Sequence, residues 1–257
     1  MQSKDQLHRI LTFPKTPKRI VSLVPSQTEL LVDLGLRENV VGITKFCVHP
    51  KNIRKEITVV GGTKKIHFDK IERLSPDIII CNKEENTKEM VEKLETIAPV
   101  WISDIITLND SIEMIKSLGK LFDVSKKAEE IIFKIEQERE LFLNFIKDKP
   151  FKKAAYVIWK NPYMLTGKNT FIDSLLQLNH FENIITSTNS RYPEIESELL
   201  KKAEVILLSS EPFPFKEKDV KKLEKELNTK VILVDGEYFS WYGSRLQKAF
   251  EYFKTLH

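Results

Sequence analysis

The sequence predicts an α/β protein with two Rossmann-like lobes, each built on a central, mostly parallel sheet, joined by one long interdomain helix. Three observations predict this fold class. Short unbroken apolar runs alternate with helical segments in the first half of the chain, one uninterrupted helical stretch follows, and the second half repeats the order of the first. Unbroken apolar runs are typical of strands covered on both faces, as in parallel sheets.

The first half begins with a polar arm and continues as alternating strands and helices. Apolar runs predict strands at residues 19–24, 40–43, 78–81 and 100–102. Helices are expected at residues 30–34, 69–74 and 87–97. Gly35 ends the first helix, because glycine readily adopts the left-handed conformation found at helix ends.

The stretch from 125 to 149 predicts one long helix. Ser125 can cap its start and Pro150 stops it. The apolar positions that form a helical stripe are Ala128, Ile131, Ile132, Ile135, Phe142, Phe145 and Ile146. This helix predicts the domain division: an N-terminal α/β lobe over residues 1–123, a connecting backbone helix over 124–149, and a C-terminal α/β lobe over 150–257.

The segments after the long helix echo those before it. Residues 34–41 match residues 178–185, residues 69–81 are echoed by 196–208, and residues 100–104 by 231–235. Three elements in the same order indicate two similar lobes.

Composition excludes several classes of protein. The chain has 257 residues with 8 Gly, 11 Pro and 2 Cys, which excludes collagen-like, low-complexity and disulfide-rich proteins. Its 41 Lys and Arg balance 37 Asp and Glu, and the basic residues are scattered in pairs, so we expect no nucleic-acid partner. No apolar stretch is long enough to predict a signal peptide or a transmembrane segment.

The candidate ligand site lies after the strands. In open α/β sheets, ligands bind beyond the carboxyl ends of the strands. Aromatic rings mixed with a few polar groups in those segments predict the wall of a site for a large, partly apolar ligand. The ligand-binding candidates are Ser26, Lys45, Phe46, Lys83, Trp159, Tyr163, Arg191, Glu211, Trp241, Tyr242 and Arg245.

Enzyme signatures are missing, and we expect the chain not to be an enzyme. It has no nucleophile elbow, zinc-protease helix, P-loop or dinucleotide-binding glycine motif, so no catalytic residues are predicted. Cys47 and His49 are weak candidates for metal ligands, since a lone pair in one loop falls short of the donors that zinc requires. They leave one alternative open: a cytosolic metal-handling or chelatase-like enzyme that uses Cys47 and His49, with Cys81 or Glu84.

Two motifs resemble those of a known family. Residues 19–30 (RIVSLVPSQTEL) and 71–80 (IERLSPDIII) are similar to signatures of the class III periplasmic substrate-binding proteins of ABC importers, which carry vitamin B12, haem or ferric siderophores. The resemblance extends from about residue 17 to the C-terminus and includes the helical-backbone metal receptors. It implies two lobes on a helix, a metal-containing cofactor or chelate bound in the cleft between the lobes, and delivery to a permease.

The resemblance also implies docking residues. Family members dock on permease arginines through one acidic residue per lobe, and the matching positions are Asp69 and Glu198. Both residues also suit the start of a helix without any partner.

At two positions where the B12 binder carries Trp, this chain has Thr63 and Asn82, which weighs against a corrin ligand. The cations near the strand ends would suit a carboxylate-rich or anionic chelate; they are Lys45, Lys83, Lys160, Arg191 and Arg245.

The remaining expectations concern cofactors, partners and location. No cofactor is required, and the ligand itself is expected to be a metal chelate such as cobalamin, a ferric siderophore or haem. The expected partner is an ABC importer permease, and the chain is expected to be a monomer. The resemblance implies a periplasmic or extracytoplasmic location, and with no signal peptide in this chain a cytoplasmic one stays open.

Overall fold

The computed structural model describes residues 1–257 and divides them into two compact units. Unit 1 comprises Met1–Asp104, Asn109–Glu136 and Tyr242–Gln247, and unit 2 comprises Ile105–Leu108, Gln137–Trp241 and Lys248–His257. The units therefore differ from a division into 1–123, 124–149 and 150–257. The long helix is shared between them, and a short C-terminal segment belongs to unit 1.

Unit 1 is built on a five-stranded parallel sheet. Its strand order is β5 (Thr58–Val59), β4 (Val40–Ile43), β3 (Ile20–Ser22), β6 (Ile78–Asn82) and β7 (Val100–Ser103). The residues of β3, β6 and β7 are buried on both faces. This burial explains why the strands read as unbroken apolar runs.

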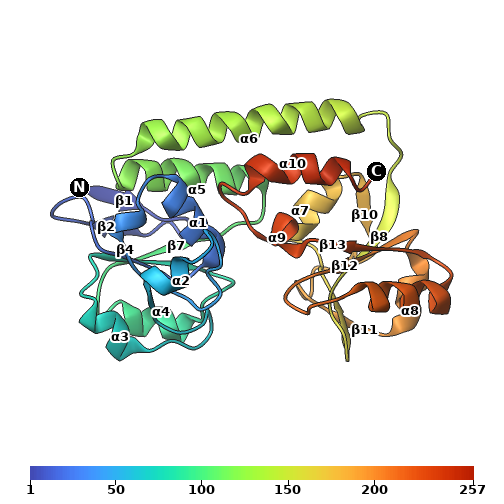
Figure 1. The fold of residues 1–257 in the computed structure, drawn as a ribbon, viewed down its shortest axis with the longest axis horizontal. Coiled ribbons are helices and arrows are strands. Elements are labelled where there is room, and N and C mark those ends of the chain that lie inside the picture. The colour runs from blue at the N-terminus through green and yellow to red at the C-terminus, as the bar shows by residue number, and fades with distance from the viewer. The chain divides into compact units, whose positions relative to one another are not determined.

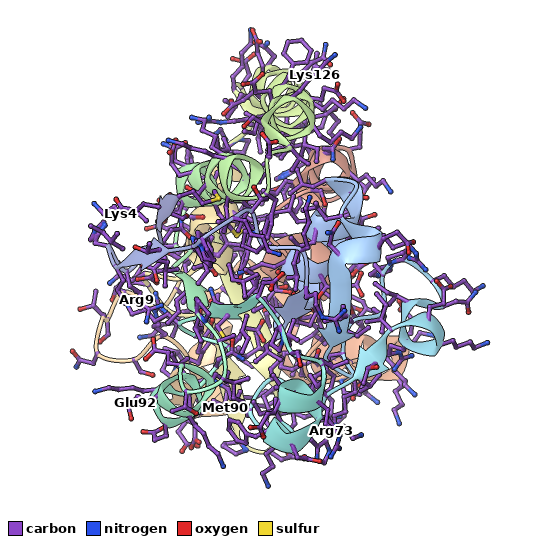
Figure 2. All side chains as sticks on the ribbon, turned by 90° about the vertical axis from the view of Figure 1, so that its left-hand side faces the viewer. Lys4, Arg9, Arg73, Met90, Glu92 and Lys126 are labelled. Carbon is purple, nitrogen blue, oxygen red and sulfur yellow. The ribbon has the colours of Figure 1, made fainter.

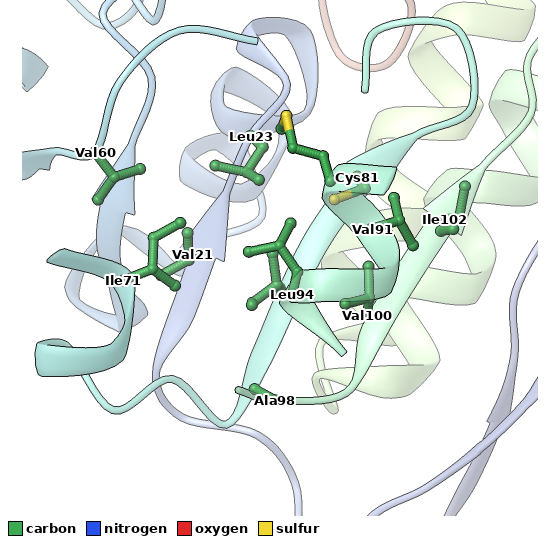
Figure 3. Packing of buried hydrophobic residues seen from close by; sticks show 12 residues of the cluster. Val21, Leu23, Val60, Ile71, Cys81, Val91, Leu94, Ala98, Val100 and Ile102 are labelled. Carbon is green, nitrogen blue, oxygen red and sulfur yellow. The ribbon is translucent and has the colours of Figure 1, made fainter. Parts of the chain in front are cut away.

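Helices cover both faces of this sheet (Figure 1). The helices are α1 (Pro25–Asp33), α2 (Ile53–Glu56), α3 (Phe68–Arg73), α4 (Lys88–Leu94) and α5 (Leu108–Leu121), and a 3-10 turn, η1, spans Arg37–Asn39. Residues of α3 and α4, including Ile71, Val91 and Leu94, pack against alternate residues along the chain at β3, such as Val21 and Leu23 (Figure 3). α1 and α5 lie on the other side of the sheet (Figure 1).

The N-terminal arm forms a hairpin that covers the edge of this sheet. β1 (Gln2–Lys4) pairs antiparallel with β2 (Ile10–Thr12), and Figure 2 shows the hairpin with Lys4 and Arg9 labelled. The amide of Gln6 donates to the carbonyl of Ile102 in β7 at 3.1 Å. The buried carboxylate of Asp5 accepts from the amide of Ile102 at 3.3 Å. The outer strand of the sheet is thus not left as an open edge.

Unit 2 has a mixed sheet of six strands. Its parallel part runs β10 (Phe181–Asn183), β8 (Lys152–Trp159), β12 (Val205–Ser209) and β13 (Lys230–Val234). This order matches β4, β3, β6 and β7 of unit 1, so the repeat expected from the sequence is present in the topology. β9 (Tyr163–Leu165) and β11 (Glu194–Ile195) add an antiparallel extension.

The helices of unit 2 form layers on its sheet. They are α7 (Phe171–Leu178), α8 (Glu217–Leu227), α9 (Gly236–Ser240) and α10 (Leu246–Lys254), with a 3-10 segment, η2, at Ser197–Lys202. Val220 and Leu223 of α8 pack on one face with Val157 and Leu208. On the other face, the ring of Tyr156 lies 5.0 Å from that of Phe239 in α9.

The long helix is α6, Ser125–Ile146. Residues up to Glu136 belong to unit 1 and those from Gln137 onward to unit 2. Phe142 is fully buried, and its ring lies 5.9 Å from Phe250 and 6.0 Å from Phe253 of α10. The parallel sheets, their helical layers and the long helix confirm the expected fold class. None of the helices combines the length and the apolar character needed to span a bilayer.

Candidate functional site

The carboxyl edge of the unit 1 sheet carries an exposed aromatic side chain. Phe46 follows β4 and is 49% exposed. The ammonium of Lys45 lies 5.0 Å from the centre of its ring, a cation–π contact. A Cβ atom at Gly62 would lie 3.2 Å from the ring, so the glycine backbone allows the ring its close approach. Phe46 and Lys45 together present a flat, cationic surface to solvent.

Behind this edge lies a buried polar network. Gln27 donates from Nε2 to the hydroxyl of Tyr242 at 3.2 Å and also to Ser103 Oγ. Asn82 Nδ2 donates to Ser103 Oγ at 3.0 Å. Burial raises the pKa of Tyr242, and hydrogen bonds to Gln27, Ser103 and Ser26 oppose that shift. Burial therefore keeps Tyr242 a neutral phenol.

Ser26 and Asn82 are both buried within unit 1. Ser26 lies buried in the first turn of α1. The side-chain oxygen of Asn82 accepts from the amides of Glu84 at 2.8 Å and Glu85 at 3.1 Å. Asn82 therefore shapes the loop after β6. Gln27 and Ser103 were not predicted as members of this network. The available signal was a polar side chain in the first turn of the helix at Gln27 and another at the end of a strand at Ser103.

Two of the expected cationic anchors in unit 1 are engaged by carboxylates. Arg245 makes two parallel hydrogen bonds to Glu29, both at 2.9 Å. Burial raises the pKa of Glu29, and the charge and hydrogen bond of Arg245 oppose that shift. Lys83 pairs with Asp104 at 2.5 Å. Each pair is neutral overall, so neither cation adds a net positive charge to the edge.

The carboxyl edge of the unit 2 sheet carries a second exposed aromatic side chain. Trp159 ends β8 and is 40% exposed. Its ring meets that of Phe213 edge to face at 5.3 Å. The ammonium of Lys160 lies 5.0 Å from Phe213, and its Nζ is 2.5 Å from Asp219 Oδ1. Asp219 thus neutralises the charge of Lys160, and the ammonium of Lys160 contacts the Phe213 ring of the aromatic pair.

A small pocket of about 100 Å³ opens beside this group. Its lining residues are Lys160, Asn161, Tyr163, Leu208, Phe215, Asp219, Lys222 and Leu223. Burial raises the pKa of Tyr163, which therefore stays a phenol and offers a hydroxyl. Arg191 is half-buried in the loop before β11, where its carbonyl accepts from the amide of Gly167 at 2.7 Å.

Glu211 lies after β12 and is held by α9. Its Oε1 accepts from the hydroxyl of Ser240 at 2.6 Å and from the indole of Trp241 at 3.0 Å. Burial raises the pKa of Glu211, and the charges of Glu237 and Asp235 add to that shift, whereas the two hydrogen bonds lower the pKa. A Cβ atom at Gly236 would lie 2.6 Å from Glu211 Cγ, so only glycine fits there. Sequence order alone could not reveal that Glu211 and Trp241 are hydrogen-bonded.

The structure does not bring metal ligands together around Cys47. Its thiol is buried against the hydroxyls of Thr28 at 3.2 Å and Thr44 at 3.3 Å. Cys81 lies in the core of unit 1 among Leu23, Val91 and Ile102 (Figure 3). Burial raises the pKa of both thiols. No group of three or more His, Cys, Asp or Glu side chains could hold a metal ion.

Asp69 and Glu198 occupy corresponding places in the two units. Asp69 lies on α3, which precedes β6, and Glu198 lies in η2, which precedes β12. Their side chains are 64% and 76% exposed and pair with Arg73 at 2.6 Å and Lys201 at 2.8 Å. Figure 2 shows Arg73 at the surface of unit 1. The hydrogen bond from Arg73 lowers the pKa of Asp69.

The sequence is similar to those of known binding proteins. An ABC transporter substrate-binding lipoprotein of Bacillus subtilis, YvrC, is 27% identical over 191 residues, which are 70% of this chain and 59% of that protein's length. A vitamin B12-binding protein of Photorhabdus laumondii is 25% identical over 246 residues, covering 91% of this chain and 86% of that protein.

Solved structures share the fold. A periplasmic heme-binding protein from Pseudomonas aeruginosa superposes with a TM-score of 0.79 at 21% identity, covering 93% of this chain and 92% of that one. The family model described as periplasmic binding protein matches residues 20–228. The chain therefore belongs to the periplasmic binding protein family.

Proposed function

We propose that the chain is the substrate-binding protein of an ABC importer and that its cargo is a metal-containing cofactor or chelate. The observation that carries the proposal is the exposed aromatic side chain at the carboxyl edge of each parallel sheet: Phe46 in unit 1 and Trp159 in unit 2. Vitamin B12 and heme, which related proteins bind, are large ligands with flat apolar rings. The residues near these edges form no nucleophile, base and acid grouping, so binding without reaction is the function proposed.

The aromatic side chains supply the affinity. Covering one exposed aromatic ring with an apolar ligand stabilises the complex by roughly 1–3 kcal/mol. Binding loses little side-chain entropy at Trp159 and Phe46, because Phe213 already contacts Trp159 and Lys45 already lies over Phe46. These two surfaces are therefore suited to a ligand that arrives as a rigid, preformed chelate.

Asp69 and Glu198 supply the contacts to the permease in this proposal. Their partners Arg73 and Lys201 lie on the same short helices, and exposed pairs of this kind contribute about 0–1 kcal/mol. Both carboxylates can therefore exchange these partners for permease cations at little cost. The proposal places the protein outside the cytoplasm, where an importer takes up its cargo, and as a monomer.

A titration tests the proposed function. The purified protein is titrated with cyanocobalamin, haemin and ferric siderophores while Trp fluorescence and heat are recorded. We expect one of these chelates to bind at a 1:1 ratio with a micromolar or lower Kd. Phe46→Ala and Trp159→Ala should each raise that Kd about tenfold.

The matched control is Phe133→Ala, which removes an exposed ring from α6 and should leave the Kd unchanged. The proposed function is wrong if none of the chelates binds. It is also wrong if a chelate binds and neither edge variant changes its affinity.

A further inference from the structure

Glu211 is a half-buried carboxylate at the carboxyl edge of the unit 2 sheet, near the carboxylates of Glu237 and Asp235. Glu211 forms no ion pair, whereas Asp219 at the same edge is paired with Lys160. The residues that accept or donate around Glu211 are Ser240 and Trp241, which are uncharged. Glu211 is thus an acceptor whose hydrogen-bond partners are uncharged and whose charged neighbours, Glu237 and Asp235, are also acidic.

The Glu211 carboxylate is held in one orientation. Both hydrogen bonds end on Oε1, at 2.6 and 3.0 Å. The backbone of Glu211 is also fixed, because Ser209 Oγ donates to its carbonyl at 2.6 Å. A Cβ atom at Gly236 would lie 2.6 Å from Glu211 Cγ, so the glycine leaves room for this side chain. A carboxylate accepts about four hydrogen bonds, so Oε2 keeps its acceptor capacity for a ligand.

Three of the five cations that would favour an anionic cargo are neutralised by carboxylates. Lys160 is paired with Asp219, Lys83 with Asp104, and Arg245 with Glu29. Withdrawing Arg245 towards a ligand would remove both guanidinium hydrogen bonds from the partly buried Glu29, which is costly. Lys45, in unit 1, lies over the ring of Phe46.

We infer that Glu211 sets the ligand specificity of this protein by accepting an N–H group from the periphery of the cargo. This inference rests on the proposed function and names the chemical class of the chelate. The preferred cargo carries amide or ammonium donors and no net negative charge near Glu211. A chelate that places a carboxylate there meets like-charge repulsion in a partly desolvated site.

A structural role for Glu211 predicts a different outcome from a specificity role. Glu211→Gln keeps an oxygen that can accept from Ser240 and Trp241, so the fold and the position of Trp241 should be retained. The substitution removes the charge and offers an N–H donor instead. A specificity role therefore predicts changes of opposite sign for the two ligand classes, and a structural role predicts the same loss for both.

The experiment measures Kd for cyanocobalamin, whose corrin ring carries primary amides, for a ferric trihydroxamate with a free ammonium group, and for haemin, which carries two carboxylates. Wild type, Glu211→Gln and Glu182→Gln are compared by calorimetry at pH 7.5. Glu182 is an exposed residue of β10, so its substitution removes an equal charge away from the site. Far-UV circular dichroism and Tm check that both variants fold.

We expect the wild type to bind cyanocobalamin or the ammonium chelate more tightly than haemin. Glu211→Gln should lower the ratio of the two affinities about tenfold or more, and Glu182→Gln should not change it. Preference of the wild type for haemin, or an unchanged ratio in Glu211→Gln, overturns the inference and leaves the proposed function standing. Binding of none of the three probes by the wild type overturns both.

Discussion

At the scale of single residues, ion pairs decide which charges a ligand can meet. Lys160 stands next to Trp159 in the sequence and follows a strand, which predicts an anion anchor. In the structure its ammonium lies between Asp219 and the rings of Phe213 and Phe215. Its position supports the aromatic surface, and its charge is neutralised.

Lys160→Met should therefore weaken chelate binding about three- to tenfold, because Phe213 loses its cation–π contact and Trp159 loses a fixed neighbour. Lys160→Arg, which keeps the charge, should restore most of the affinity. Calorimetry gives the affinities, and Trp fluorescence anisotropy reports the mobility of Trp159. An unchanged affinity and anisotropy in Lys160→Met would contradict this role.

His257 predicts a pH dependence of stability. Burial lowers its pKa from 6.5 to about 4, and the charges of Lys152 and Lys149 add to the shift. Its ring stacks on Phe181 at 5.0 Å. Since the folded state disfavours the protonated ring, this contribution to stability is complete above pH 6.5 and is lost as pH falls towards 4.

We expect the wild type to lose about 1 kcal/mol more stability than His257→Gln between pH 7 and pH 4, after allowing for solvent screening. Urea unfolding at several pH values measures the difference. If the free energy of unfolding changes equally with pH in the wild type and in His257→Gln, the histidine does not titrate in this way.

At the scale of elements, the sequence predicts best what is buried on both faces. Residues 40–43 and 78–81 form strands as expected, since apolar runs without alternation leave few other choices. The hairpin of β1 and β2 was missed because its strands are short and largely exposed. α5 was missed because its polar start and Gly119 interrupt the apolar pattern.

The candidate site was predictable in part. Ligands of open α/β sheets bind beyond the carboxyl ends of the strands, and this rule identified the segments that carry Phe46, Trp159 and Glu211. The partners of the charged residues were not predictable, because Glu29 and Arg245 are joined only by the tertiary fold. Spacing in the sequence says nothing about such a pairing.

The hairpin yields a prediction about stability. Asp5 is buried and accepts from the amides of Leu7 at 3.0 Å and Arg9 at 2.9 Å, and it is paired with the Arg9 guanidinium at 2.7 Å. Asp5→Ala should lower the free energy of unfolding by about 2–3 kcal/mol, because these donors lose a charged acceptor. Lys4→Ala on the exposed neighbour should change it by less than about 0.5 kcal/mol. Equal values from denaturant unfolding of the two variants would contradict the anchoring role of Asp5.

At the scale of the whole molecule, each unit carries one acidic residue at a corresponding place. We expect the double variant Asp69→Lys and Glu198→Lys to abolish transport by the importer and to keep the Kd for the chelate. Reversal of both charges replaces attraction to permease cations with repulsion. Glu72→Lys with Glu194→Lys, two exposed carboxylates near these positions, is the control. Transport is measured in vesicles that contain the permease, and normal transport by the double variant would exclude these docking residues.

Native mass spectrometry most directly tests the proposal that the protein binds a metal chelate through Phe46 and Trp159. The purified protein is mixed with an equimolar set of cyanocobalamin, haemin and a ferric trihydroxamate and transferred intact. We expect one dominant complex that holds a single chelate, and we expect this complex to be lost in the variant that carries both Phe46→Ala and Trp159→Ala. A spectrum with free protein alone, or with equal occupancy in the variant, would contradict it.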